Sequence, residues 1–218
     1  MAGPSAPQGS GVTGVIVDPR FCVSYPVEMA IVRKVMKLKG GNFVITDVNG
    51  NMMFKVKDPL FGLHDKRILL DSSGAQVLTL REKIMSMHSR WQVLRGGSKQ
   101  QGDLLYTVKK TSMVQLIRTK LEVFLSHNKE EKTCDFRVRG NWSESSCVVY
   151  AGESDTIVAQ MQKNDTWQST LWGKDNYTVT AYPNVDYAFI ASLIVILHDI
   201  NCSSSLPILD MGTSLLLN

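Results

Sequence analysis

The stretch Tyr187-Ala-Phe-Ile-Ala-Ser-Leu-Ile-Val-Ile-Leu197 decides the fold, because Ser192 is its only clearly polar residue. A helix that is apolar on every face lies inside a large protein core or inside a bilayer. A bilayer span needs about 20 apolar residues, so this stretch of eleven is too short. The stretch therefore predicts a helix that is surrounded by protein on all sides.

Most of the remaining chain has the pattern of β-strands, which indicates what surrounds the helix. Residues 43–48 and 52–57 flank Asn49-Gly50, a pair that favours a type I′ hairpin turn. Two more hairpins are expected, one turning through residues 71–74 and one through 96–98. Further strand candidates are 113–118, 120–125, 134–139, 146–151, 156–162, 167–172 and 177–182. About a dozen strands at this spacing favour an antiparallel barrel. The predicted fold class is mainly β (α+β), a closed antiparallel barrel around a central hydrophobic C-terminal helix.

The length of 218 residues suits one β domain. We expect a flexible leader rich in Gly and Pro over residues 1–20, and the barrel domain over residues 21–201 with its helix at 184–200. Residues 202–218 form an atypical tail that we expect to be disordered. Asn184 or Asp186 can cap the helix. His198 lies in the expected last turn, where a cation suits the helix dipole.

Cysteine usage and the N-terminal composition indicate the compartment. The four cysteines have no C-x-x-C spacing, so we interpret them as free thiols in a reducing environment. No charged region followed by an apolar region stands at the N-terminus, so we expect no secretory signal. A cytoplasmic protein is expected, one that could also associate with the plasma membrane or enter the nucleus.

Charge is distributed unevenly along the chain. Residues 31–120 carry 17 Lys and Arg against 6 Asp and Glu, whereas residues 121–218 carry 6 against 12. One interpretation is two oppositely charged parts of an ordinary solvated surface. The other is a basic face for an anionic partner, such as a membrane phosphoinositide or a nucleic acid. In the strand over residues 134–139, Asp135, Arg137 and Arg139 alternate with apolar residues, which predicts one solvent-facing side.

Two clusters of basic residues are candidate lipid-binding sites. Lys109 and Lys110 end one expected strand, and Arg118 and Lys120 lie on either side of the turn that follows. If the two strands are neighbours, the four charges meet at one rim of the barrel. The alternative is a solvated strand end without a ligand. The second cluster is equally ambiguous and consists of Arg33, Lys34, Lys37 and Lys39.

Several stretches carry a resemblance to a known family. They are Ala30-Ile-Val-Arg-Lys34, residues 42–51, Phe54-Lys-Val-Lys57, Leu69-Leu-Asp71 with Gly74, Trp91-Gln-Val and residues 175–189. Over about residues 12–200 the chain resembles the plant LURP-one-related proteins. The resemblance implies the tubby C-terminal fold, a twelve-stranded barrel around a hydrophobic helix, which phospholipid scramblases share. The tail from Cys202 onward departs from the family.

The resemblance also bears on ligands. Residues 175–177 and 182–183 match part of a scramblase segment that is proposed to bind calcium, but Gly173 stands where the leading carboxylate would be. Calcium is coordinated by six to eight oxygens, so the loss of one carboxylate weakens such a site. No metal site is therefore expected. Tubby proteins bind phosphatidylinositol bisphosphate through basic side chains, none of which can be aligned residue by residue with this chain.

No catalytic motif is apparent, and we expect a protein that is not an enzyme and needs no cofactor. The four histidines are far apart, and neither a phosphate loop nor a G-x-S-x-G motif occurs.

The first hypothesis is a membrane-tethered phosphoinositide-binding module or transcription regulator similar to tubby. The second is an interaction or scaffold protein in plant defence signalling, and scramblase-like lipid transport is the least favoured. Aromatic residues make up 8% and do not interleave with the basic clusters, so direct nucleic-acid binding is not expected. A monomer without a transmembrane span is expected, with anionic lipid or proteins as partners.

Overall fold

Twelve antiparallel strands close into one barrel, in the order β1-β12-β11-β10-β9-β8-β7-β6-β5-β4-β3-β2. The structure, a computed structural model, describes residues 14–32, 43–57, 66–83, 90–97, 100–111, 119–141, 146–163 and 176–203. The strands are β1 (Val27–Val32), β2 (Phe43–Thr46), β3 (Met52–Lys57), β4 (Lys66–Asp71), β5 (Gln76–Lys83), β6 (Arg90–Arg95), β7 (Leu104–Lys110), β8 (Thr119–Leu125), β9 (Phe136–Gly140), β10 (Val148–Ala151), β11 (Ile157–Lys163) and β12 (Asn176–Ala181). Two 3₁₀ turns, η1 (Pro19–Phe21) and η2 (Gln101–Asp103), and one helix, α3 (Tyr187–Ser203), complete the described elements.

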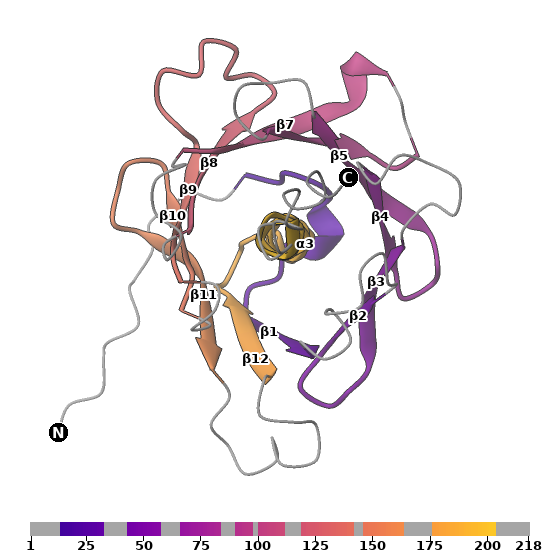
Figure 1. Ribbon diagram of the computed structural model, residues 1–218. Coiled ribbons are helices and arrows are strands. Elements are labelled where there is room, and N and C mark those ends of the chain that lie inside the picture. Colours follow the sequence, from indigo (N-terminus) through magenta and orange to yellow (C-terminus); the bar gives the residue numbers. More distant parts are fainter. Residues whose placement is uncertain are drawn as a thin grey trace, which may run out of the picture.

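Each strand pairs with the strand that follows it in the chain, and the ring closes where β1 meets β12 and β2 (Figure 1). The β1–β12 ladder is complete and runs from Val27↔Ala181 to Val32↔Asn176. The β1–β2 ladder is short and consists of Ala30↔Thr46 and Ile31↔Ile45. The expected closed antiparallel barrel is confirmed. The strand candidates 113–118 and 167–172 lie outside the described residues.

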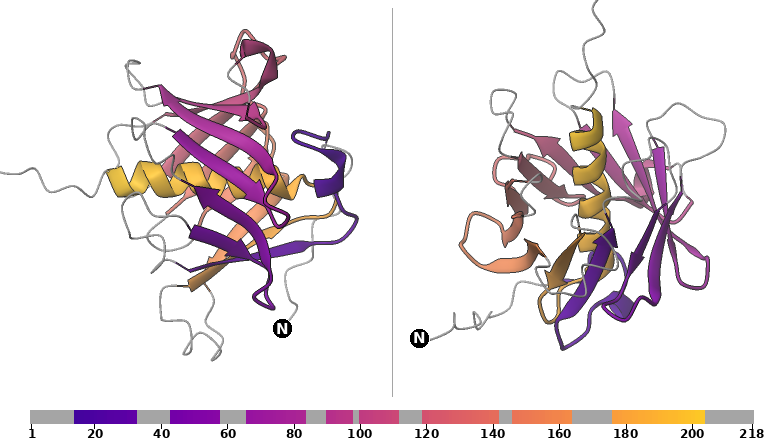
Figure 2. Two further views of the ribbon diagram at one scale, coloured as in Figure 1. Left: turned by 90° about the vertical axis from the view of Figure 1, so that its right-hand side faces the viewer. Right: turned by 60° about the horizontal axis from the view of Figure 1, so that its bottom comes forward.

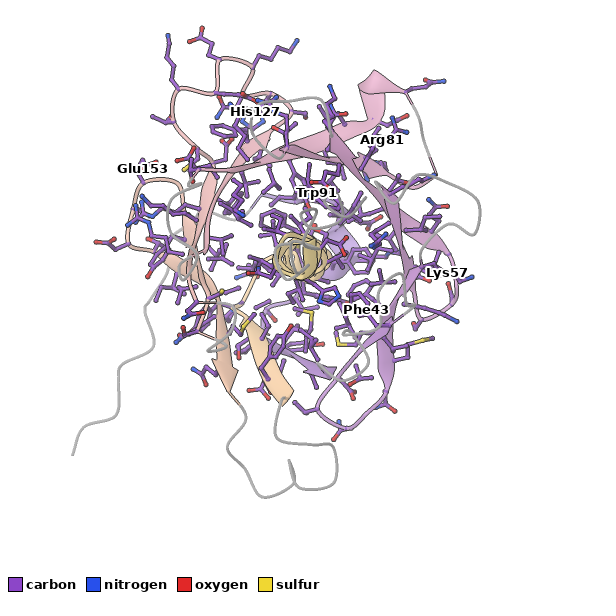
Figure 3. The ribbon with its side chains drawn as sticks, viewed as in Figure 1. Phe43, Lys57, Arg81, Trp91, His127 and Glu153 are labelled. Atoms are coloured by element: carbon purple, nitrogen blue, oxygen red, sulfur yellow. The ribbon has the colours of Figure 1, made fainter. Side chains whose placement is uncertain are left out.

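Helix α3 runs along the barrel axis and is enclosed by the strands (Figures 1 and 2). The residues from Ala188 to Asp199 are all buried, and Ile194 near the middle is 2% exposed. Phe43 and Trp91 extend from the barrel wall toward the helix (Figure 3). Because every face of α3 meets the inner side of a strand, its apolar sequence needs no bilayer. The described residues contain no helix that is long and apolar enough to cross a membrane.

Ser192, the polar residue of the helical stretch, has partners inside the core. Its hydroxyl donates to the carbonyl of Phe189 over 2.6 Å, and it forms a hydrogen bond with the hydroxyl of Tyr106 on β7. Both side chains are fully buried. A buried hydroxyl without a partner would cost stability, so this pair removes a penalty and links the helix to the wall.

The helix boundaries differ from those expected over residues 184–200. Helix α3 begins at Tyr187 because Asn184 adopts a positive φ of 63°, which ends the preceding turn rather than starting a helix. Asp186 is the cap, since its Oδ1 accepts the backbone N–H groups of Ala188 and Phe189 at 3.1 Å. The helix continues to Ser203, so His198 does not lie in the last turn, and its ring contacts Phe43 edge-on.

Residues 16–21 cover the end of the barrel at which α3 begins. Val17 and Phe21 are buried. The other carboxylate oxygen of Asp186, Oδ2, accepts the N–H of Val17 at 2.7 Å and that of Asp18 at 3.2 Å. The flexible leader expected over residues 1–20 therefore does not extend to residue 20, because this segment packs against the barrel. Its Gly- and Pro-rich composition suggested a linker, but Val17 and Phe21 have apolar surface to bury.

The hairpin between β2 and β3 forms at the expected place with a different turn. Gly50 has a φ of 85°, whereas Asn49 is absent from the described residues with positive φ, so the type I′ turn is wrong. The N–H of Gly50 donates to the carbonyl of Asp47, and Asp47 Oδ1 accepts the N–H groups of Asn49 and Asn51. This is the three-residue loop in which a type I turn is followed by a left-handed glycine. Its driving force is the Asp47 side chain, which satisfies the turn's backbone donors.

Candidate functional site

Basic residues gather at the end of the barrel where α3 ends. Because the strands are antiparallel, the ends of β3, β5, β7, β9 and β11 and the starts of β4, β6 and β8 all lie there. We call the following cations, which lie within the last or first two residues of those strands, the basic rim: Lys57, Lys66, Lys83, Arg90, Lys109, Lys110, Lys120 and Arg139. Arg67 also lies there, but its guanidinium pairs with Asp199 of α3, so it is not counted in the rim. At the opposite end, acidic side chains outnumber Lys129 and Lys132 in the described connections and at the adjoining strand ends, among them Asp47, Asp71, Asp103, Asp135, Glu153 and Asp155. The barrel therefore carries opposite charge at its two ends.

Cross-strand register brings several of these cations directly opposite one another. Within the rim the pairs are Lys83↔Arg90, Arg90↔Lys109 and Lys120↔Arg139. Lys66 faces Arg81, which lies two residues before the end of β5, and Lys109 also faces Glu122. Like charges at directly opposed positions destabilise a sheet. A series of such pairs on one part of a barrel indicates a surface that is suited to an anion. Lys57 and Arg81 extend outward from the wall (Figure 3).

The structure brings together part of the predicted lipid-binding cluster. Strands β7 and β8 are neighbours, and the N–H of Thr111 donates to the carbonyl of Lys120, so Lys110 and Lys120 lie at one rim as the sequence suggested. Lys120 is exposed, and Lys110 is half-buried. Arg118, like Arg33, Lys34, Lys37 and Lys39 of the second cluster, lies outside the described residues.

Lys109 has a different environment from its neighbours at the rim. Its ammonium forms an ion pair with the carboxylate of Glu131, and it lies 4.7 Å from the centre of the Phe124 ring. Arg90, which faces Lys109 across β6 and β7, donates from Nη2 to the same Glu131 oxygen at 2.7 Å. Thr107 Oγ1 donates to the other Glu131 oxygen at 3.2 Å. We call Arg90, Thr107 and Lys109 the cradle, which surrounds one carboxylate with three donor side chains.

Glu131 belongs to the connection between β8 and β9. Its own N–H donates to Asn128 Oδ1 at 3.2 Å, and its φ is +50°, a value that non-glycine residues seldom adopt. Partial burial raises the pKa of Glu131, but the hydrogen bonds from Lys109 and Arg90 outweigh this effect and hold the pKa below its usual range. Glu131 is therefore ionised at neutral pH.

Arg90 and Arg139 are site residues that sequence reasoning did not select. Arg90 is distant in sequence from Lys109, and Arg139 from Lys120, so only the register of the barrel brings them together. For Arg139, the alternation of polar and apolar residues over 134–139 could have indicated an exposed position. The same alternation was wrong about Arg137, which is buried because residues 152–155 cover it. Its guanidinium donates to the carbonyl of Gly152 and contacts Glu153 and Asp155.

Metal-ligand clusters and reactive thiols are the other kinds of site that the described side chains could form. Within the described ranges, no three His, Cys, Asp or Glu side chains are placed to hold a metal ion. Burial, together with the hydrogen bond to Glu153, raises the pKa of the Cys134 thiol to about 12. That thiol is protonated at neutral pH and is a poor nucleophile. The rim and the cradle thus form the principal candidate site of the described residues.

Comparison with known proteins gives a consistent result. The family model described as LURP-one-related matches residues 27–199. The chain is 68% identical to Protein LURP-one-related 15 of Arabidopsis thaliana over 203 residues, covering 89% of this chain and 93% of that protein. It is 63% identical to Protein LURP1 of the same organism over 186 residues, covering 85% and 89%. An X-ray structure of a protein from Arabidopsis thaliana matches with a TM-score of 0.69 and 63% identity, covering 86% of this chain and 99% of that one.

Proposed function

The chain belongs to the LURP-one-related family, and from that premise we propose that it is a non-enzymatic module that docks on anionic membrane surfaces. The preferred ligand is a phosphoinositide headgroup, and the docking surface is the basic rim. By analogy with the tubby fold, release from the membrane would let the protein act elsewhere in the cell. The observation that carries the proposal is the gathering of like-charged side chains at one end of the barrel.

The charge distribution supports docking through that end. Within the described residues, Lys57, Lys66, Lys110, Lys120 and Arg139 make no ion pair with another described side chain. A basic residue near an anionic leaflet contributes about 1 kcal/mol, so four or five together contribute about 4–5 kcal/mol, which corresponds to a Kd of roughly 0.2–1 mM. The acidic side chains at the opposite end disfavour the reverse orientation. The rim thus selects which end of the barrel faces the membrane.

We expect the variant Lys110→Ala/Lys120→Ala to bind phosphoinositide vesicles at least about tenfold more weakly than the wild type. The measurement is co-sedimentation with vesicles of phosphatidylcholine alone, and with added phosphatidylserine or phosphatidylinositol 4,5-bisphosphate at equal surface charge. Two salt concentrations are compared, because electrostatic docking weakens as salt rises.

Lys129→Ala/Lys132→Ala is the matched control, since it removes two exposed lysines on the connection between β8 and β9. This control should retain most of the binding. Equal losses in both variants would show that only net charge matters. Equal binding of the wild type to neutral and to phosphoinositide vesicles would refute the proposal and direct attention to protein partners.

A further inference from the structure

We propose that the cradle of Arg90, Thr107 and Lys109 is a phosphate-binding site whose donors are occupied by Glu131 when no ligand is bound. The ligand class is a phosphate monoester, such as a phosphate group on an inositol headgroup. This inference rests on the proposed function and deepens it, because it assigns a specific site that shares two residues with the rim and an internal competitor for that site.

The donors of the cradle fit a phosphate group better than a carboxylate. An arginine, a lysine and a hydroxyl converge on Glu131 from two neighbouring strands. A phosphate monoester carries nearly two negative charges and three acceptor oxygens, whereas a carboxylate carries one charge and two oxygens. Three converging donors can therefore each meet a separate phosphate oxygen, and a guanidinium is well suited to phosphate geometry.

The register of the sheet supplies a second argument. Arg90 and Lys109 face each other directly, and Lys83 faces Arg90 from the other side. Like charges at directly opposed positions destabilise a sheet; Glu122 of β8 faces Lys109 on its other side, and a second counterion contacts both Arg90 and Lys109. Glu131 supplies that counterion from outside the barrel wall rather than from one of these strands, so its removal would leave the donors in place.

The environment of Glu131 is compatible with displacement. The side chains of Arg90, Lys109 and Glu131 are 29%, 28% and 20% exposed, so solvent reaches the charged part of the cradle, whereas Thr107 is buried. Glu131 occupies it from a left-handed backbone conformation, which costs a non-glycine residue free energy. The cradle also overlaps the rim, because Arg90 and Lys109 belong to both. A headgroup docked at the rim could thus reach the cradle by displacing one side chain.

The test compares two charge-neutralising variants of adjacent residues. Glu131→Gln removes the carboxylate from the cradle, whereas Glu130→Gln removes the same charge from a side chain that is 74% exposed and paired with Lys132. We expect Glu131→Gln to bind phosphatidylinositol 4,5-bisphosphate vesicles on the order of tenfold more tightly than wild type, because the cradle no longer has an internal occupant. Glu130→Gln should change binding by less than about twofold.

Two further measurements make the result specific to the cradle. In Glu131→Gln/Arg90→Gln the gain should disappear, because a phosphate donor is lost. Titration with soluble inositol 1,4,5-trisphosphate by calorimetry distinguishes the ligand source. A gain with both probes assigns the site to the phosphate group itself, and a gain with vesicles alone assigns it to a phosphate presented by a lipid surface. Thermal unfolding of each variant shows that the barrel is intact.

The two proposals fail in distinguishable ways. Equal effects of Glu131→Gln and Glu130→Gln, or weaker binding by Glu131→Gln with an intact barrel, would overturn the cradle while leaving docking at the rim. Wild-type protein that does not discriminate phosphoinositide from neutral vesicles would overturn the proposed function. If Glu131→Gln bound the soluble headgroup more tightly in that case, the cradle would stand as a site for a free phosphate ester.

Discussion

Replacing Ile194 with aspartate is expected to unfold the domain. Ile194 is 2% exposed near the middle of α3, and the helix is surrounded by strands (Figure 1). A carboxylate at this position would lack a partner and be far from water, which costs several kcal/mol. Because a typical domain is stable by only about 5–15 kcal/mol, little of the variant should remain folded. The measurements are circular dichroism and urea unfolding.

Ile194→Val is the control, because it changes the same buried side chain without introducing a charge. It removes one methylene group and should cost about 0.5–1.5 kcal/mol, leaving a folded barrel with a slightly lower Tm. A well-expressed Ile194→Asp protein with the wild-type Tm would mean that α3 is not central.

Replacing Asp186 with alanine is expected to lower the free energy of unfolding by about 3–5 kcal/mol. This carboxylate accepts N–H groups from both the first turn of α3 and residues 17–18. Losing a helix cap costs about 0.5–2 kcal/mol, and each buried donor left without a partner costs about 1–3 kcal/mol. The measurement is urea unfolding, combined with limited proteolysis at residues 14–21, where cleavage should become faster.

Asp186→Asn separates the two functions of this side chain. Asparagine is a good N-cap, but its NH₂ group cannot accept the N–H of Val17, so an intermediate loss is expected. An Asp186→Ala protein as stable as the wild type would contradict the double role.

Burial raises the pKa of Asp186, although hydrogen bonds from Val17, Phe189 and Asp18 lower it. Because the pKa of Asp186 is higher in the folded than in the unfolded state, protonation of this carboxyl group stabilises the fold. That contribution is complete below about pH 4 and is lost as pH rises through the folded-state pKa. Asparagine does not titrate, so the stability difference from wild type should narrow as pH rises.

The architecture was predictable because its cause is local in sequence. Helix α3 is apolar on all sides, and the hairpins at residues 49–50, 71–74 and 96–98 carry their own turn residues. Both signals can be recognised without knowing which strands are partners. The type of turn at Asn49-Gly50 was not predictable from that pair alone, because the Asp47 side chain determines which backbone donors are satisfied. The ordered segment at Val17 was missed for a similar reason, since its partner, Asp186, lies near the other end of the chain.

The candidate site was only partly predictable, because charge clusters in a barrel depend on register. Lys110 and Lys120 were found since they flank one connection between neighbouring strands. Arg139 required knowledge that β8 pairs with β9, and Arg90 that β6 pairs with β7. No sequence signal indicated that Glu131 would reach Lys109, because this contact depends on the conformation of a long connection.

The place where the barrel closes has a consequence for synthesis of the protein. Strand β1 has its complete ladder with β12, and only a short one with β2. When β1 leaves the ribosome, its principal partner has not yet been translated, and the helix that fills the interior is made later still. The nascent chain therefore holds an unclosed sheet with an empty apolar interior until almost all of it has emerged. Contacts between distant parts of a chain form slowly and expose surfaces prone to aggregation, so a chaperone that shields this intermediate should raise the yield of folded protein.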